Sequence, residues 1–262
     1  MKKYFLLLLV TTGVGSNAQD LSVYQSAYYI SNEGRLPYRI LYPLNFDSIR
    51  SYPMIVFLHG AFGKGIDNNL QLNIGGQYFL REENRKDFPA FVIFPQCPLD
   101  DSWAYFEAKI DSATGLAKQW VFPFLKNPTA PTALLKKILD SLLALSFIDK
   151  SRIYIGGLSQ GGMGVYDLVA RYPETFAAAF PICGAGRVST AKNFAGKTSL
   201  WIFHGDKDNI VPVYFSRNYY RRLKKLGADV KYTEYPGAFH NSWINVFAEK
   251  DLLPWLFSKS KK

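Results

Sequence analysis

Short, nearly continuous apolar runs recur along the chain and alternate with longer stretches in which apolar and polar positions mix. Such runs predict buried parallel strands, because a strand covered on both faces has no polar side. They lie at residues 54–58, 91–94, 152–155, 177–182 and 200–203. Residues 230–235 alternate and predict a strand near the sheet edge. Residues 27–30 and 36–42 flank Asn32-Glu33-Gly34, a turn signal, and predict a hairpin.

Helical periodicity appears between these strands, at residues 132–145, 161–172, 213–226 and 252–257. The proline and glycine positions agree with these helix ends. Pro131 suits the first turn of a helix, Pro173 ends one, and Gly227 is a good residue to follow one. The alternation of strands and helices predicts an α/β fold with a mostly parallel central sheet and helices on both faces.

Residues 99–130 fit neither pattern and are expected to form an aromatic-rich insertion over one end of the sheet. Their aromatic residues include Trp103, Tyr105, Phe106, Trp120, Phe122 and Phe124. Trp103 comes shortly after the predicted strand at 91–94, and ligands bind at the carboxyl ends of strands in open α/β sheets. Its indole is therefore predicted to line a substrate pocket, whereas the last three aromatics are expected to pack the insertion onto the sheet.

The first eighteen residues read as a signal peptide. Lys2 and Lys3 precede an apolar run at residues 4–10, and Ser16-Asn17-Ala18 is a cleavage site of small residues. The alternative is a buried terminal strand. We expect cleavage after Ala18, export to the periplasm or beyond, and one catalytic domain over residues 19–262. No later apolar stretch is long enough to span a membrane.

Composition narrows the class of protein. Hydrophobic residues make up 48% of the chain and charged residues 20%, which excludes wholesale disorder, a collagen repeat and a coiled coil. The net charge of +10 becomes +8 without the two lysines of the signal peptide. The basic residues accompany no nucleic-acid-binding motif, so no nucleic-acid partner is expected.

The strongest chemical signal is a G-x-S-x-G motif at residues 157–161, with Ser159 at its centre. A predicted strand precedes it and a predicted helix follows, as in the sharp turn that presents a nucleophilic serine. Two alternatives are a glycine-rich helix cap and a phosphate-binding loop. The loop would require a lysine after the glycines, and none is present.

A nucleophilic serine requires a base, and the chain offers His59, His204 and His240. In α/β hydrolases the order is serine, acid, histidine, and only His240 follows Ser159. His59 and His204 each precede a glycine at a predicted strand end. We expect both to have structural roles.

The acid must then lie between Ser159 and His240. The aspartates there are Asp167, Asp206, Asp208 and Asp229. Asp167 lies within a predicted helix and Asp229 at the wrong end of a strand. Asp206 and Asp208 both follow the strand at 200–203, and position alone leaves both open.

Three features together resemble the α/β-hydrolase carboxylesterases, which include dienelactone hydrolases and phospholipase/carboxylesterases. They are GLSQGG at residues 157–162, HGxxDxxVP at 204–212 and the late histidine turn. The resemblance implies the α/β-hydrolase fold and makes Asp208 the acid. Residues 58–68, 94–98 and 239–243 resemble a secreted branch of predicted peptidases related to feruloyl and polyhydroxybutyrate esterases. One departure is Phe62-Gly63-Lys64, where that branch more often has Gly-Glu-Arg.

The expected mechanism needs two N–H donors for an oxyanion. One is predicted at the backbone of Gln160, and the other at Ala61 or Phe62. Trp243, in the matched segment 239–243, is a second candidate for substrate binding beside Trp103. The expected function is a secreted serine hydrolase that cleaves small-molecule or polysaccharide-linked carboxylic esters without metal or organic cofactor. The alternatives are a serine peptidase of the same fold and a catalytically inactive binding protein.

The two cysteines are predicted to be free thiols. In an α/β-hydrolase sheet two strands separate those that precede Cys97 and Cys183, which places the cysteines about 14 Å apart. A disulfide needs Cα atoms within ~7 Å. The sequence contains no cluster of cysteines and histidines, so no zinc site is expected.

Overall fold

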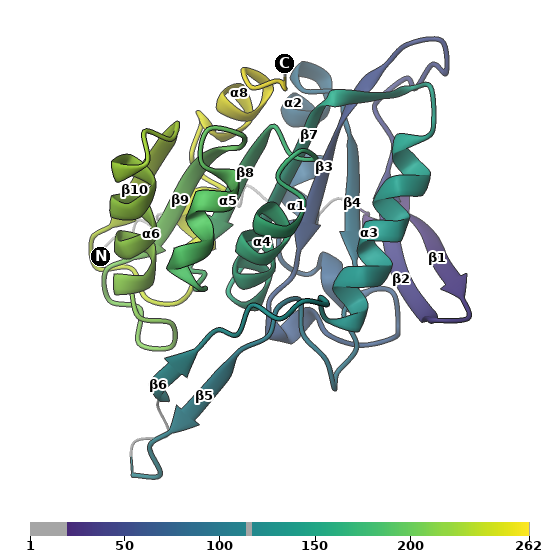
Figure 1. Cartoon of the computed structure of the whole chain (residues 1–262). Helices are drawn as coiled ribbons and strands as arrows, with labels where there is room; N and C mark the ends of the chain where they lie inside the picture. Colours follow the sequence, from purple (N-terminus) through teal and green to yellow (C-terminus); the bar gives the residue numbers. More distant parts are fainter. Residues whose placement is uncertain (1–19, 114–116, 262) are drawn as a thin grey trace, which may run out of the picture.

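The computed structural model describes residues 20–113 and 117–261, and its centre is an eight-stranded sheet (Figure 1). The strand order is β1-β2-β4-β3-β7-β8-β9-β10. The strands are β1 (Gln25–Ser31), β2 (Gly34–Leu41), β3 (Tyr52–Leu58), β4 (Phe91–Pro95), β7 (Ile148–Leu158), β8 (Ala178–Ile182), β9 (Ser199–Gly205) and β10 (Val230–Tyr235). β2 pairs antiparallel with β1 and β4, and all strands from β4 to β10 in this order are parallel. The predicted mostly parallel sheet is confirmed.

Helices cover both faces of this sheet. They are α1 (Gly76–Leu80), α2 (Glu82–Asp87), α3 (Ala130–Leu143), α4 (Gln160–Arg171), α5 (Ala191–Phe194), α6 (Tyr214–Lys225), α7 (Trp243–Val246) and α8 (Leu252–Phe257). The four predicted helices correspond to α3, α4, α6 and α8, while α1, α2, α5 and α7 are too short to show a periodicity. In the described part of the chain, no helix has the length and apolar character required to cross a membrane.

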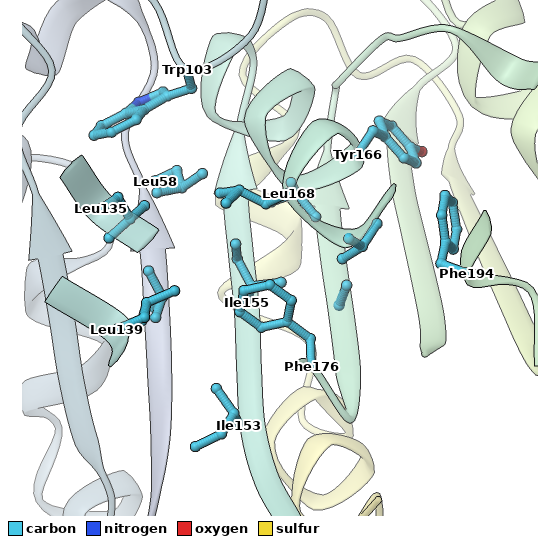
Figure 2. Close-up of a cluster of buried hydrophobic side chains, with 14 of the residues drawn as sticks. Leu58, Trp103, Leu135, Leu139, Ile153, Ile155, Tyr166, Leu168, Phe176 and Phe194 are labelled. Carbon is cyan, nitrogen blue, oxygen red and sulfur yellow. The ribbon is translucent and has the colours of Figure 1, made fainter. Parts of the chain in front are cut away.

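The alternation of side chains along β3 divides the interior into two cores. Met54, Val56 and Leu58 face the core under α3, α4, α5 and α6, whereas Ile55 and Phe57 face the core under α1, α7 and α8. All seven residues of β3 are buried, as expected for a strand covered on both sides. Figure 2 shows part of the first core, where side chains of β3 and β7 meet those of α3 and α4.

The described residues of segment 99–130 contain a hairpin that pairs with no strand of the main sheet. Its strands β5 (Glu107–Ile110) and β6 (Ala117–Val121) are antiparallel and form a separate two-stranded sheet. The hairpin stands out from the body at the end where the parallel strands finish (Figure 1). The predicted signal peptide, residues 1–18, lies outside the described residues.

Cys97 and Cys183 are both buried and both free, which confirms the prediction of two free thiols. Strands β3 and β7 lie between β4 and β8, as the argument from strand order assumed. Burial raises the pKa of the Cys97 thiol to about 12 and raises that of Cys183 still further above its ordinary value.

Candidate active site

Ser159 occupies a sharp turn between β7 and α4. Its backbone is strained, with φ 54° and ψ −118°. The flanking glycines make this turn sterically possible, since a β-carbon at Gly161 would lie 2.0 Å from the carbonyl oxygen of Leu58 and one at Gly157 would lie 2.7 Å from Gly161. The Ser159 N–H donates to the carbonyl of Ile182 in the next strand, at 2.9 Å, which anchors the turn to the sheet. The predicted strand–turn–helix context is therefore present.

His240 lies on the turn after β10 and reaches Ser159 across the ends of two strands. Its Nε2 is 2.9 Å from the Ser159 Oγ, and its Nδ1 is 2.8 Å from the Asp208 Oδ2. A carboxylate only accepts, so Nδ1 carries the hydrogen and Nε2 is free to accept the serine proton. The imidazole side chain is 18% exposed, so the array opens on the surface at this residue.

Asp208 lies on the loop after β9, and its side chain is fully buried. Its Oδ1 accepts the backbone N–H groups of Ile210 and Val211, both at 2.9 Å. Burial acts to raise the pKa of this carboxyl, but hydrogen bonds from His204, His240 and the backbone outweigh burial and hold the pKa well below its ordinary value. The Asp208 side chain is therefore a buried anion at neutral pH.

Asp206, the other aspartate left open by the sequence, is not the hydrogen-bond partner of His240. Its Oδ1 accepts the N–H of Gly237 at 2.6 Å. Gly237 belongs to the turn that carries His240, so Asp206 ties that turn to the loop after β9. The structure therefore brings Ser159, His240 and Asp208 together and gives Asp206 a tethering position.

The loop after β3 approaches Ser159 from the other side. A β-carbon added to Gly60 would lie 3.4 Å from the Cβ of Ser159. Among the described residues, the N–H groups of Ala61, Phe62 and Gln160 form no backbone hydrogen bond, so all three predicted oxyanion donors are unpaired. Gln160 is the first residue of the twelve-residue helix α4, whose dipole adds positive potential at this end.

His59 fixes the start of this loop. Its Nε2 accepts the N–H of Cys97 at 2.9 Å, so its Nδ1 carries the hydrogen and donates to the Gly60 carbonyl at 2.7 Å. Burial lowers the pKa of the imidazole to about 4, partly offset by the bond to Gly60. His59 is therefore neutral and structural, as the sequence suggested.

A cavity of about 260 Å³ opens beside Ser159 and His240. Its lining is largely apolar and includes Phe62, Leu70, Ile74, Phe106, Trp120, Met163, Ile210 and Trp243. Phe106 directly precedes β5 and Trp120 lies in β6, with their ring centres 5.9 Å apart; we call these two residues the aromatic wall. Phe122 stacks on Trp120 and meets Phe215 of α6 at 5.3 Å, so the wall is anchored to the body of the protein.

The prediction for Trp103 is corrected by the structure. Its indole is 1% exposed, lies with Leu58 and Leu135 in the core, and is absent from the cavity lining (Figure 2). Its Nε1–H donates to the carbonyl of His59 at 3.2 Å. Trp103 therefore packs beneath the loop after β3, because its segment turns inward after β4 instead of continuing over the cavity.

Trp243 does line the cavity, and its ring meets that of His240 edge-on at 5.9 Å. The aromatic wall is the part of the site that the sequence analysis missed, since Trp120 was expected to be packing. Trp120 and Phe122 are two residues apart, a spacing that fits two aromatic rings on one face of a strand but does not distinguish a cavity wall from a core.

Three cavity-lining side chains contain a buried polar atom without a partner among the described residues: the Oε1 of Gln71, the Oε1 of Gln160 and the Nε1 of Trp120. For Gln71 the orientation is fixed by its neighbour. Asn68 donates its amide to the Ala27 carbonyl, so its Oδ1 must accept from the Gln71 Nε2, at 2.6 Å. An unpaired buried acceptor costs about 1–3 kcal/mol, which a ligand donor or a water would offset.

Cys183, Asp208 and His240 place possible metal-ligand atoms within 4.8 Å of one another. The carboxylate and the imidazole of this cluster are already hydrogen-bonded to each other. Burial keeps the Cys183 thiol protonated by raising its pKa, whereas metals bind the thiolate. The donor set therefore fits a hydrogen-bonded array better than an ion site.

The sheet carries a serine on a strand–helix turn, and this serine is hydrogen-bonded to a histidine that is hydrogen-bonded to a buried aspartate. This arrangement defines the class of protein: the chain has the α/β-hydrolase fold. Residues 128–250 match the model of the phospholipase/carboxylesterase family. The resemblance drawn from the motifs at residues 157–162 and 204–212 is thereby confirmed.

Known proteins agree with this class. A solved thermostable esterase is 35% identical, with a TM-score of 0.80 over 92% of this chain, which spans 64% of that protein. A solved ferulic acid esterase, 15% identical, matches 88% of this chain and 96% of its own with a TM-score of 0.66, which shows the shared fold alone. Poly(3-hydroxyalkanoate) depolymerase C of Paucimonas lemoignei is 42% identical over 50 residues, 19% of this chain and 12% of that protein. The chain is similar to carboxylic ester hydrolases in sequence and structure.

Proposed function

We propose that the protein is a serine hydrolase that cleaves carboxylic esters through an acyl-enzyme on Ser159. The Ser159 Oγ attacks the carbonyl carbon while its proton passes to the Nε2 of His240. The tetrahedral intermediate collapses, the alcohol leaves with the proton from His240, and the serine remains acylated. Water then attacks the acyl carbon, gives a proton to His240, and releases the acid as Ser159 recovers its proton.

Asp208 and the backbone N–H donors stabilise the charges that develop during the reaction. Asp208 holds the His240 tautomer and stabilises the imidazolium that forms during each proton transfer. The N–H groups of Gln160 and of Ala61 or Phe62 are the proposed donors to the oxyanion, and losing one such donor typically costs about 3 kcal/mol in the transition state. None of these steps requires a metal or an organic cofactor.

The observation that carries the proposal is the unbroken hydrogen-bond chain from Ser159 to Asp208, at 2.9 Å and 2.8 Å, beside an apolar cavity. A hydroxyl bonded to a correctly oriented imidazole is the arrangement that generates a nucleophile at neutral pH. The unpaired N–H groups of Ala61 and Gln160 next to it provide the second requirement for acyl transfer.

The test is labelling by a fluorophosphonate probe together with turnover of short 4-nitrophenyl esters. The wild type should do both. Ser159→Ala should lose labelling and about 10⁴-fold or more in kcat while its melting temperature stays unchanged. A wild type that reacts with neither reagent would leave a binding protein of this fold, and faster cleavage of matched peptide amides than of esters would make the protein a peptidase.

For the substrate, we propose an ester with an apolar, aromatic-compatible acyl group that carries a hydrogen-bonding substituent. The aromatic wall and Ile74 favour an apolar group. The unpaired oxygens of Gln71 and Gln160 favour a hydroxyl that donates to them. The measurement compares kcat/KM for 3-phenylpropionate and 3-(4-hydroxyphenyl)propionate esters of one alcohol, and a ratio near one would remove the hydroxyl from the proposal.

Export is also proposed, on the lysines and the apolar run that precede Ala18. Expression of the full chain in a bacterial host, followed by fractionation and N-terminal sequencing, tests it. A mature chain beginning at Gln19 outside the cytoplasm supports export, and an uncleaved cytoplasmic chain contradicts it.

A further inference from the structure

A second histidine contacts the carboxylate of Asp208. His204, on β9, is fully buried, and its Nε2 lies 3.2 Å from the Asp208 Oδ2 and 2.8 Å from the carbonyl oxygen of Val211. On the other side of the ring, the Nδ1 of His204 lies 2.7 Å from the Oγ of Ser216 on α6. Sequence reasoning had given this residue only a role in holding its loop.

The partners decide which nitrogen of His204 carries the hydrogen. A carbonyl oxygen can only accept, so the contact with Val211 requires a hydrogen on Nε2. This nitrogen donates to the Val211 carbonyl at 2.8 Å, and the Asp208 Oδ2 lies 3.2 Å from the same nitrogen. Ser216, whose side chain is also buried, can donate its hydroxyl hydrogen to the free Nδ1. The ring is thereby held with its Nε2–H beside the Asp208 carboxylate.

With this donor, both oxygens of Asp208 are held by pairs of hydrogen bonds. Oδ1 receives the N–H groups of Ile210 and Val211, and Oδ2 receives His204 and His240. A carboxylate held at both ends cannot rotate about its terminal bond. The lone pair that faces the Nδ1 of His240 is therefore fixed in direction, and the anion is compensated although it is buried.

We propose that His204 is a positioning residue for proton transfer: it orients the Asp208 carboxylate toward His240 through its Nε2–H. The inference rests on the proposed serine hydrolase function and adds a fourth residue to its array. His204 does not line the cavity and has no hydrogen bond to Ser159, but it bonds the carbonyl of Val211, which does line the cavity. An effect through Asp208 should appear in kcat, whereas an effect through Val211 should appear in KM.

The experiment separates positioning from stability with two substitutions at one site. His204→Leu removes the donor and keeps an apolar filling, whereas His204→Gln keeps an N–H near the position of Nε2. Thr198→Val is the matched control, because Thr198 is equally buried just before the same strand and its hydroxyl donates to the Phe176 carbonyl at 2.9 Å, far from Asp208. Melting temperature, kcat and KM are measured for each on a 4-nitrophenyl ester.

His204→Leu should lower kcat roughly 10- to 100-fold with little change in KM, since misplaced reacting groups cost about this much. His204→Gln should recover most of that loss, and Thr198→Val should lose stability while keeping kcat. Equal kcat in His204→Leu and Thr198→Val, or no recovery in His204→Gln, would overturn the inference. If His204→Leu does not fold, Ser216→Ala tests the ring from its other side: a lower kcat at unchanged KM is expected, and an unchanged kcat contradicts it. Failure of the wild type to hydrolyse esters would instead refute the proposed function.

Discussion

The floor of the cavity, made by the loops after β7, β9 and β10, differs from its aromatic wall in what holds each residue in place. On the floor, Ser159 is anchored through its own backbone N–H, and Asp208 accepts two backbone N–H groups. On the wall, Phe106 and Trp120 belong to a hairpin outside the main sheet, and their side chains are held by ring contacts and by packing against apolar neighbours such as Met163.

This difference separates chemistry from selectivity. Backbone hydrogen bonds and steric limits fix the floor atoms within the small tolerance that proton transfer requires. Ring contacts on a projecting hairpin tolerate exchange of one apolar side chain for another at a modest cost. Substitutions on the floor should therefore act on kcat, and substitutions on the wall should act on the choice of acyl group.

The largest expected effect is that of Asp208→Asn. The amide oxygen would take the position of Oδ1, which accepts two backbone N–H groups, so the NH₂ group would face His240 and His204. A donor opposite Nδ1 forces the hydrogen of His240 onto Nε2, which can no longer accept the serine proton. We expect kcat to fall about 10³- to 10⁴-fold.

Asp206→Asn is the matched control for this effect. Its amide oxygen can still accept the N–H of Gly237, so the turn that carries His240 should stay in place. We expect only a few-fold change in kcat, measured on the same ester. A larger loss in Asp206→Asn than in Asp208→Asn would show that the tether, and not the carboxylate beside His240, limits the reaction.

The floor was predictable from the sequence because its geometry requires particular residue types that few others can replace. Gly157 and Gly161 are required by contacts shorter than any β-carbon allows, so the turn around Ser159 leaves a local pattern. Position after the strand at 200–203 left Asp206 and Asp208 open, and family resemblance chose Asp208. Which of them meets His240 is a matter of how two loops lie across neighbouring strands, and only the fold shows that.

The wall could not be predicted in the same way, because a tryptophan that lines a pocket and a tryptophan in a core have the same local sequence pattern. Trp103 and Trp120 differ in where their segments turn after leaving the sheet. Trp103 turns inward and is held by Thr132, whose hydroxyl donates to the Trp103 carbonyl at 2.6 Å. Trp120 lies on a strand that, within the described part of the chain, pairs only with β5. Hairpin pairing and chain direction, and not composition, decide these roles.

The second prediction concerns Trp103→Ala. Truncation leaves a cavity beneath the loop that begins at His59 and removes the bond from the indole N–H to the His59 carbonyl. The free energy of unfolding should fall by about 3–5 kcal/mol. Urea unfolding measures this loss, and the preference among acyl esters of the folded fraction should match that of the wild type. An altered preference among acyl esters with unchanged stability would show that Trp103 lines the cavity after all.

The third prediction is a pH dependence of stability that arises at His59, at the start of the loop after β3. His59 is neutral in the fold with a pKa of about 4, against an ordinary value of 6.5. Between these values the unfolded chain binds one more proton, so stability is fully present above about 6.5 and is lost as the pH falls toward 4. The loss attributable to this group is at most roughly 3 kcal/mol.

Urea unfolding at pH 7 and at pH 4.5 measures this loss, with His59→Gln as the comparison. The amide cannot titrate, so the variant should lose less stability on acidification than the wild type does. Asp208 is separable, because its lowered pKa makes its own contribution disappear only as the pH falls below the ordinary value of 3.8. Equal losses in both proteins would place the pH-sensitive group elsewhere.

The smallest expected effect is that of Trp120→Ala, and it tests the wall directly. The substitution removes one ring from the lining and leaves Phe122 in contact with Phe215, so the hairpin should keep its place. The ratio of kcat/KM for a phenylpropionate ester over an acetate ester should fall by a factor that corresponds to ~1–3 kcal/mol, with kcat for the acetate unchanged. Ile110→Ser is the control, because Ile110 is an exposed residue of the same hairpin that does not line the cavity. Equal ratios in the two variants would mean that the wall does not select the acyl group, and the contrast between floor and wall would then be one of architecture without a consequence for the substrate.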